Sequence, residues 1–299
     1  MAKIVVVGSS NTDMVVKTPR FPEPGETILG GDFFMFPGGK GANQAVAAAR
    51  MGGIVSFVCC VGDDIFGQNA LLGYKNENIN VDGCLLAKGS PSGIALITVN
   101  AEGENEIVVA SGANNLLSEA HISAHSKLLN SAEIVLTQLE TPLAVVNQLA
   151  AHCKNSGQRF IVNPAPAQQL SADILDDLFL ITPNETESKL LTGIDVKDED
   201  SAEIACQRFF DKGVQNVIIT MGSRGAFFMN SDEKMLIAPP KVTAIDTTAA
   251  GDIFNGTLTV FLAQGLSWQQ SIEKANRAAA ISVTRMGAQA SAPYKNEIK

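Results

Sequence analysis

A short segment near the C-terminus has the residue types of an anion-binding helix start. It reads Ala244-Ile245-Asp246-Thr247-Thr248-Ala249-Ala250-Gly251-Asp252 and continues into an apolar, helix-compatible run that ends at Gly265. The two threonines are favoured N-cap residues, and the small residues after them leave the free N–H groups of the first helical turn accessible. These donors and the positive end of the helix dipole attract an anion. The segment therefore predicts a pocket that a phosphate group can approach closely.

Asp252 lies within the first turn of this predicted helix, where its carboxylate would repel the same phosphate. Acidic residues in first turns often only complement the helix dipole. We favour a chemical role instead. In that role the carboxylate is a general base beside a phosphoryl group and takes the proton of an attacking hydroxyl.

A second glycine-rich segment, Gly38-Gly39-Lys40-Gly41-Ala42-Asn43-Gln44, runs into the strong helix former at residues 45–50. Clustered glycines at a helix start let a ligand approach the backbone. The segment is not a Walker A loop, because Gly41 rather than Ser or Thr follows Lys40. The dinucleotide fingerprint is absent as well, because no G-x-G-x-x-G follows the first predicted strand.

Polar residues follow several predicted strands, at the sheet edge where ligands of open α/β proteins bind. Asn11 and Asp13 belong to a predicted turn after the strand at residues 3–8, although such residues can also simply bond their own backbone. Glu140 follows the predicted strand at residues 134–139, and Asn184 and Glu187 follow the strand at 179–182. We expect these polar groups to converge on one rim of the sheet.

The strand–helix alternation predicts a single α/β domain over residues 1–299 with a mostly parallel sheet. β-like runs at residues 27–36, 94–99 and 107–110 interrupt this alternation, and we expect one small accessory sheet inserted from about 12–36 and 92–111. We also expect one continuous strand over residues 54–62 and one continuous helix over residues 118–130. The loop Gly222-Ser223-Arg224-Gly225 could lie against a nucleotide or form a tight β-turn.

The bulk composition excludes several classes of protein. The net charge of −9 argues against a broad nucleic-acid or acidic-membrane surface, and no apolar run approaches the roughly 20 residues that span a bilayer. The five cysteines lack C-x-x-C spacing, which favours reduced thiols in an intracellular, cytoplasmic protein. His121 and His125 are spaced i, i+4, but the stretch lacks the glutamate of a zinc protease and predicts a solvated helix face.

Residues 38–52 and 246–256 together closely resemble the paired signatures of the ribokinase-like (PfkB-type) carbohydrate kinases, with Thr182-Pro183-Asn184-Glu185-Thr186-Glu187 between them. The resemblance covers essentially the whole chain. It implies a central, mostly parallel sheet flanked by helices, with a small β-sheet lid. It also implies ATP-dependent phosphorylation of the 5-hydroxyl of D-ribose, which gives D-ribose 5-phosphate and ADP.

The resemblance also assigns roles by position. Asp252 would be the base, and the anion hole would comprise Ala249, Ala250 and Gly251. The sugar would be held by Asn11, Asp13, Gly39, Lys40, Asn43, Glu140 and Asp252. The ATP site would comprise Asn184, Thr220, Gly222, Ser223, Gly225, Gly251 and Asn276, with Mg²⁺ held through water by Asn184 and Glu187. An activating K⁺ would be surrounded by Asp246, Thr248, Ser282, Arg285, Gly287 and Ser291.

The sequence departs from the family pattern at two places. Many members have Gly where Ala249 stands, and the chain ends at Lys299 soon after the last motif, so we expect a shortened C-terminal helix near the adenine site. The resemblance also implies that the lid pairs two subunits. Phe33, Phe34, Met35 and Phe36 would supply apolar surface for such a homodimer, unless they pack inward against the sugar or the main domain.

Two alternatives remain beside a ribose kinase. One is a kinase of the same fold for another sugar or a nucleoside, such as deoxyribose or fructose. The other is a non-catalytic sensor of a sugar or nucleotide on a kinase scaffold. The intact Asp252 and anion-hole sequence argue against the sensor.

Overall fold

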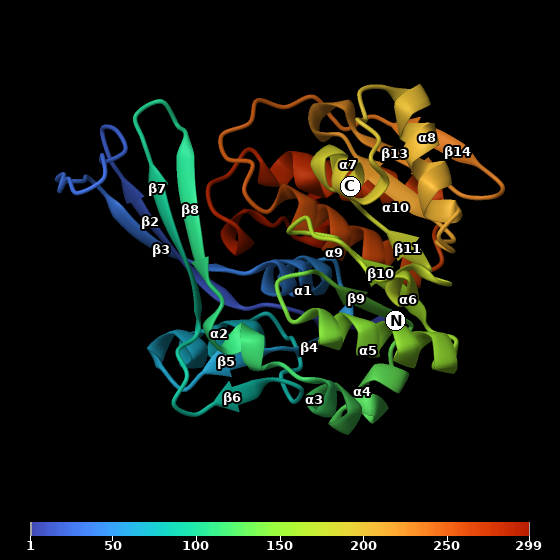
Figure 1. The fold of residues 1–299 in the computed structure, drawn as a ribbon, viewed down its shortest axis with the longest axis horizontal. Coiled ribbons are helices and arrows are strands. Elements are labelled where there is room, and N and C mark those ends of the chain that lie inside the picture. Colours follow the sequence, from blue (N-terminus) through green and yellow to red (C-terminus); the bar gives the residue numbers. More distant parts are fainter. Residues whose placement is uncertain (1, 299) are drawn as a thin grey trace.

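In the computed structural model, which describes residues 2–298, a large sheet is covered by helices and a small sheet projects from this body (Figure 1). The large sheet has eight strands in the order β14-β13-β12-β11-β10-β9-β1-β4. Its parallel strands are β4 (Ile54–Val58), β1 (Lys3–Val7), β9 (Ile134–Thr137), β10 (Arg159–Val162), β11 (Leu180–Ile181) and β12 (Val217–Thr220). Two antiparallel strands complete it, β13 (Ala226–Met229) and β14 (Lys234–Ile237). The expected mostly parallel α/β sheet is confirmed.

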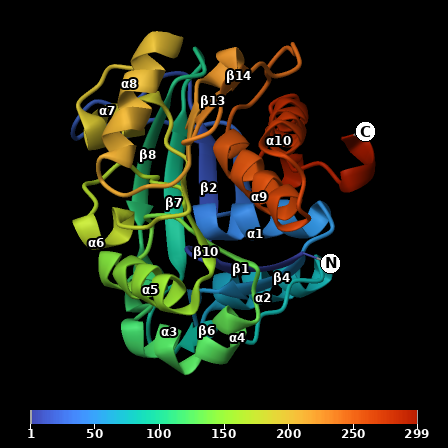
Figure 2. The same ribbon diagram turned by 90° about the vertical axis from the view of Figure 1, so that its right-hand side faces the viewer.

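Helices cover both faces of this sheet, as Figure 2 shows from the side. One layer contains α1 (Lys40–Arg50), α2 (Ile65–Asn76), α9 (Ala250–Ala263) and α10 (Trp268–Ser282). The other contains α3 (Glu119–Ala124), α4 (Ser126–Asn130), α5 (Leu143–Ser156), α6 (Ala172–Leu175), α7 (Glu185–Thr192) and α8 (Glu199–Phe210). In β1, Ile4 and Val6 pack into the first layer and Val5 and Val7 into the second. Burial on both faces explains the continuous apolar runs of the strands.

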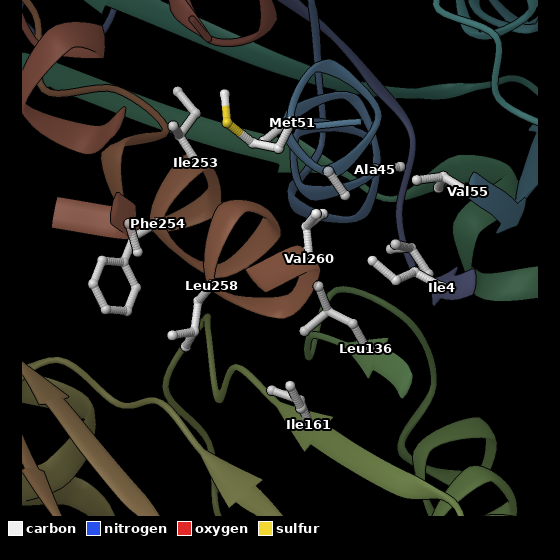
Figure 3. Close-up of a cluster of buried hydrophobic side chains, with 14 of the residues drawn as sticks. Ile4, Ala45, Met51, Val55, Leu136, Ile161, Ile253, Phe254, Leu258 and Val260 are labelled. Carbon is white, nitrogen blue, oxygen red and sulfur yellow. The ribbon is translucent and has the colours of Figure 1, made fainter. Parts of the chain in front are cut away.

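The helices α1 and α9 lie against each other over the sheet, with Ala45, Ile253 and Val260 among the side chains between them (Figure 3). Their close approach depends on small residues. A Cβ added at Gly256 would lie 2.4 Å from the Gln44 backbone oxygen and 2.8 Å from the Ala47 Cβ. Because the two helices pack this closely, their first turns meet at one place.

The small sheet has the strand order β3-β2-β7-β8, with β2 and β7 parallel and the outer pairs antiparallel. Its strands are β3 (Phe33–Gly38), β2 (Asn11–Lys17), β7 (Gly93–Val99) and β8 (Asn105–Ala110). A separate parallel pair joins β5 (Cys60–Gly62) to β6 (Leu85–Ala87). Short 3₁₀ turns complete the described elements: η1 (Gly112–Leu116), η2 (Gly222–Arg224), η3 (Gln289–Ser291) and η4 (Lys295–Glu297).

Several local predictions are wrong, because strand pairing between distant segments or the local backbone geometry decided otherwise. The predicted turn at Asn11 and Asp13 is the start of β2, because these residues pair with β3 and β7. Within residues 27–36, strand structure begins only at Phe33. The predicted strand at 54–62 divides between two sheets, and the predicted helix at 118–130 is interrupted at His125.

Candidate active site

The first turns of α1 and α9 meet at the carboxylate of Asp252. Asn43 Nδ2 donates a 3.0 Å hydrogen bond to Asp252 Oδ2, and Gln44 Nε2 donates one of 3.0 Å to Asp252 Oδ1. Asp252 is buried, with only 5% of its surface exposed. An acidic residue that merely complemented the helix dipole would not need two buried amide donors from another helix. The arrangement therefore holds one carboxylate in a fixed orientation.

The helix start at Asp252 leaves backbone donors unused. The N-cap is Ala249, in the left-handed conformation with φ 60°, and no side chain caps the helix. The prediction that Thr247 or Thr248 is the N-cap is thus wrong. Among residues 2–298, the amides of Gly251 and Asp252 have no hydrogen-bond acceptor, and a Cβ added at Gly251 would meet nothing within 4 Å. The Ala250 N–H, a member of the predicted anion hole, instead donates to the Thr247 oxygen at 3.3 Å. This turn offers open N–H donors to an anion.

Four acidic residues and one lysine share this part of the molecule. Burial raises the pKa of Asp252 and of Glu187, while the charge of Lys40 opposes both shifts. The charge of Asp252 raises the pKa of Lys40. Burial, followed by the charges of Glu140 and Asp252, raises the pKa of Asp13 to about 6. Carboxylates are hydrogen-bond acceptors, so the cluster suits a ligand that presents hydroxyl donors.

Asn11 and Asp13 project from the start of β2 toward glycines. A Cβ added at Gly93 would lie 2.2 Å from Asn11 Oδ1, and one added at Gly38 would lie 2.2 Å from Asp13 Oδ2. Asn114 of η1 holds Asn11, because its Nδ2 donates to Asn11 Oδ1 at 2.7 Å. The glycines therefore make room for both polar side chains.

Glu140 fixes the glycine-rich start of α1. Its Oε2 accepts hydrogen bonds from the backbone N–H of Lys40 at 2.9 Å and from Ser9 Oγ at 2.5 Å. Gly39, which precedes this helix, has φ 88°, and a Cβ there would lie 2.7 Å from the Asn11 nitrogen. Glycine is thus required by both conformation and space. The structure brings the predicted sugar-binding residues together around Asp252.

Asn184 and Glu187 form a capping box at the start of α7. Asn184 Oδ1 accepts the Glu187 N–H at 2.8 Å, and Glu187 Oε2 accepts the Asn184 N–H at 2.8 Å. The backbone of Asn184 also forms an isolated parallel β-bridge with Thr220 at the end of β12. Glu187 is within electrostatic reach of Lys40 and Asp252, which places the pair beside the acidic cluster around Asp252.

The remaining predicted nucleotide residues lie on η2, directly after it, and on α10. Gly222 and Gly225 have φ values of 54° and 104°, and a Cβ at Gly225 would lie 2.1 Å from the Ile237 oxygen. Ser223 lies within the turn, so the β-turn alternative describes its backbone. Asn276 is buried and donates to the Ile237 oxygen at 2.8 Å. No hydrogen bond described within residues 2–298 joins these residues to Asp252.

The residues predicted to surround a monovalent cation lie on two adjoining loops. Asp246 Oδ1 accepts the Thr248 N–H at 2.9 Å, and Oδ2 accepts the Gly287 N–H at 2.8 Å. Burial alone would raise the pKa of Asp246, but hydrogen bonds from the Thr248 side chain and from the Gly287 and Thr248 N–H groups lower it below its ordinary value. The loops are also joined where the Ile245 N–H donates to the Val283 oxygen at 2.7 Å.

The other three members of this set lie on the second loop and its neighbours. Ser282 ends α10, and its hydroxyl bonds the Ala279 oxygen. The Arg285 guanidinium pairs with Glu297. Ser291 ends η3, and its hydroxyl bonds the Ala288 oxygen. Three side chains are thus committed elsewhere, so these residues could offer a cation mainly their backbone carbonyls.

Comparison with known proteins identifies the family. The family profile described as pfkB family carbohydrate kinase matches residues 1–295. The chain belongs to this family. It is 43% identical over 294 residues to a ribokinase from Haemophilus influenzae, across 98% of this chain and 96% of that protein. It is 36% identical to a deoxyribokinase from Salmonella typhimurium, across 97% of this chain and 95% of that protein.

The fold of this pfkB family member matches solved structures as well. The structure of Arabidopsis thaliana ribokinase complexed with ribose and ATP superposes with a TM-score of 0.94 at 30% identity. That match covers 100% of this chain and 98% of the Arabidopsis chain. The ribokinase-like fold predicted from the sequence is therefore confirmed.

Several buried polar residues of this family member were not among the predicted site residues. They are Ser9, Gln44, Asn114, Gln138 and Asn163, which contact the predicted residues or one another. Gln44 lies inside the glycine-rich segment, so its position carried a signal. Asn114, by contrast, lies 103 residues from its partner Asn11, and no local pattern marks it.

Proposed function

We propose that the protein is an ATP-dependent ribokinase, which transfers the γ-phosphoryl group of ATP to the 5-hydroxyl of D-ribose. The products are D-ribose 5-phosphate and ADP. The observation that carries the proposal is the buried Asp252 carboxylate, held by Asn43 and Gln44 beside the open amides of α9. The 43% identity to a ribokinase and the likeness to a ribokinase bound to ribose and ATP support it.

Each site residue then has a task in the transfer. Asp252 takes the proton as the 5-hydroxyl oxygen forms its bond to the γ-phosphorus, and the bond from that phosphorus to the β,γ-bridging oxygen breaks. The amides of Gly251 and Asp252 stabilise charge on the transferred group. Asn11, Asp13 and Asn43 hold the sugar hydroxyls. Because the base and the anion donors share one helical turn, binding both substrates there aligns them.

Magnesium accompanies ATP in this proposal. The carboxylate of Glu187 accepts hydrogen bonds from Asn184 but retains further lone pairs, so it can also accept from a metal-bound water. Mg²⁺ keeps several waters and binds chiefly through substrate phosphates, which suits a site with so few protein ligands. When bound, Mg²⁺ neutralises phosphate charge. Asn184 and Glu187 would hold it through water.

A potassium ion is proposed at the two loops joined by Asp246. The Asp246 carboxylate is partly buried and ionised, and it holds the Thr248 and Gly287 segments side by side. Carbonyl oxygens of the two loops would complete the coordination. The ion would fix the loop that leads into the anion-binding turn at Ala249, which is how it would raise activity.

The small sheet is proposed to act as the lid over the sugar and as the dimer interface. Strand register places Met35, Met14, Leu96 and Val108 in one row across all its strands. Asp13 lies on the opposite face, because neighbouring residues of a strand alternate sides. Met35, Leu96 and Val108 are 57%, 50% and 66% exposed. So large an apolar row, directed away from the sugar, supports pairing of two lids.

Residues 2–298 contain no helix long and apolar enough to cross a membrane. We propose that the enzyme lies in the cytoplasm, where ATP is available and where its free cysteines stay reduced. The acidic net charge of −9 supports small-molecule partners rather than nucleic acid.

The decisive experiment is ATP consumption with D-ribose, 2-deoxy-D-ribose, D-fructose and a nucleoside. We expect the highest kcat/KM with D-ribose, because a polar group left unpaired by a missing hydroxyl is costly. The Asp252→Asn protein, purified in the same way, controls for contaminating kinases. A higher kcat/KM for 2-deoxy-D-ribose would favour the deoxyribokinase alternative, which the 36% identity to such an enzyme makes the main competitor. No turnover with any substrate would favour the sensor.

A further inference from the structure

A buried chain of side-chain amides leads from the end of β11 to the Asp252 carboxylate. Gln44 Nε2 lies 3.0 Å from Asp252 Oδ1 and 3.0 Å from Asn163 Oδ1. Asn163 Nδ2 in turn lies 3.1 Å from the Thr182 carbonyl oxygen, and Gln138 Nε2 lies 2.6 Å from Gln44 Oε1. Gln44 and Gln138 are fully buried, so their amides lie out of reach of bulk solvent.

The direction of each hydrogen bond in this chain follows from its anchor. A backbone carbonyl only accepts, so the Thr182 oxygen requires the NH₂ group of Asn163 to face it. The Asn163 oxygen then faces Gln44 and requires the NH₂ group of Gln44 on that side. Both N–H bonds of Gln44 are therefore committed, one to Asn163 and one to Asp252. Gln44 can present only a donor to the Asp252 carboxylate.

The hydroxyl of Thr182 supports the neighbouring backbone. Thr182 Oγ1 lies 2.6 Å from Asn255 Oδ1, and Asn255 Nδ2 donates to the Gly251 oxygen at 2.8 Å. One residue at the end of β11 thus anchors two chains of contacts. Its carbonyl leads to the base, and its hydroxyl leads to the turn that carries the anion donors.

We infer that Gln44 is a positioning residue for the catalytic base, which it keeps oriented and ionised through an amide relay anchored at Thr182. This inference rests on the proposed role of Asp252 as the base. Burial favours the neutral carboxyl, which cannot accept a proton. A donor fixed against Oδ1 stabilises the charged form and opposes that effect. Asn43 does the same at Oδ2, but its own oxygen has no hydrogen-bond partner within residues 2–298 and so belongs to no comparable relay.

The test is the Gln44→Met variant, which keeps the length of the side chain and removes its donor. We expect the pKa of Asp252 to rise by about one unit or more, the size expected for a hydrogen bond to a charged group. The pKa is measured in the ligand-free protein by ¹³C-carboxyl NMR, with the Asp252 signal assigned from Asp252→Asn. The acid limb of the kcat–pH profile should move to higher pH by a similar amount, while KM for ATP stays within about twofold.

Two further variants make the result specific. Asn163→Ala breaks the relay without touching Asp252 and should shift the same pKa in the same direction by a smaller amount. If Gln44→Met does not fold, Asn163→Ala alone tests the relay. Asn216→Ala removes another buried amide, which donates to the Phe179 oxygen at 2.7 Å before β12. It should lower the unfolding temperature and leave both the Asp252 pKa and the acid limb unchanged.

The outcomes separate this inference from the proposed reaction. An unshifted Asp252 pKa in folded Gln44→Met, or in Asn163→Ala alone if the first is unfolded, would overturn the relay. An equal shift in Asn216→Ala would overturn it too, because the effect would then follow any loss of a buried amide. The NMR titration needs no substrate, so it remains informative even if ribose is not phosphorylated.

Discussion

Asn43 and Asp252 are 209 residues apart in the chain and are joined by a 3.0 Å hydrogen bond from the Asn43 amide to the carboxylate. The bond connects the two glycine-rich segments that carry the family resemblance. It forms because Gly256 lets α9 approach α1 closely, so that both helices begin at the same place. A sugar held by the first segment and a phosphate held by the second would therefore meet at Asp252.

The first prediction is that Asp252→Asn lowers kcat by about 10²–10⁴-fold, the usual contribution of a general base. Binding of ATP should change little or tighten, since a charge that opposes the phosphates is removed. Steady-state kinetics and calorimetric titration with ATP measure the two quantities. The new NH₂ group must face Asn43 or Gln44, both of which are donors, and this could destabilise the protein. Circular dichroism therefore checks that the variant is folded.

The matched control for this variant is Glu119→Gln, which changes an exposed acidic residue in the first turn of α3. It should cost at most about 1 kcal/mol of stability and leave kcat intact. If folded Asp252→Asn behaves in the same way and retains more than about a tenth of wild-type kcat, then its carboxylate only complements the helix dipole and the base lies elsewhere.

The sequence predicted what depends on local pattern. The apolar runs of the parallel strands and the two glycine-rich helix starts identified the fold and most of the residues around Asp252. Interactions between distant segments were not predictable, such as the pairing of Asn11 with Gly93, which makes the expected turn a strand. The threonine N-cap failed for a similar reason. Asp246 accepts the Thr248 N–H and the distant Gly287 N–H, and the chain then turns at Ala249.

The second prediction is that Asp13→Asn stabilises the ligand-free protein at neutral pH. The pKa of Asp13 is raised from 3.8 to about 6 by burial and by the charges of Glu140 and Asp252. The folded protein therefore favours the neutral Asp13 carboxyl. The stability that this carboxyl contributes is fully present below about pH 4 and is lost as the pH rises through about 6. Above that pH the charged carboxylate costs up to about 3 kcal/mol, which asparagine avoids.

Thermal unfolding from pH 4 to pH 8 measures this effect. The difference in Tm between Asp13→Asn and wild type should grow with pH and level off above about pH 6. Glu102→Gln, on the exposed hairpin of the small sheet, should show no such trend. The same Asp13→Asn protein should lose at least about tenfold in kcat/KM for ribose, because a charged acceptor is removed. A difference in Tm that is constant with pH would contradict the assigned ionisation.

The third prediction is that Ala249→Gly stabilises the protein by about 1 kcal/mol. Ala249 has φ 60°, a conformation that costs alanine free energy and glycine almost none. Ala250→Gly is the matched control, since Ala250 is the first helical residue of α9 and glycine there gives no relief. Chemical denaturation measures both. The idea fails if the two variants change stability in the same direction, and kcat should remain near wild type for Ala249→Gly.

The fourth prediction is that activity in K⁺ buffer is well above that in Na⁺ buffer. The loops joined by Asp246 would be ordered by a cation that their carbonyls can surround. In Asp246→Asn the activation should largely disappear, because the new NH₂ group would face the Thr248 or Gly287 N–H and separate the loops. Equal rates in K⁺, Na⁺ and tetramethylammonium at constant ionic strength would show that no monovalent site affects catalysis.

The last prediction is that the protein is a homodimer formed by the small sheet. Met35 and Leu96 lie in the apolar row that faces away from Asp13, and each is at least half exposed in a single chain. Leu96→Glu should place a charge at the centre of that row and give a monomeric mass in light scattering at micromolar concentration. Ile204→Glu provides the control, because Ile204 is 52% exposed on α8, far from the small sheet in the fold, and should leave a dimer (Figure 1). A fully active wild-type protein with a monomeric mass would rule out this interface, and the apolar row would then need another partner to cover it.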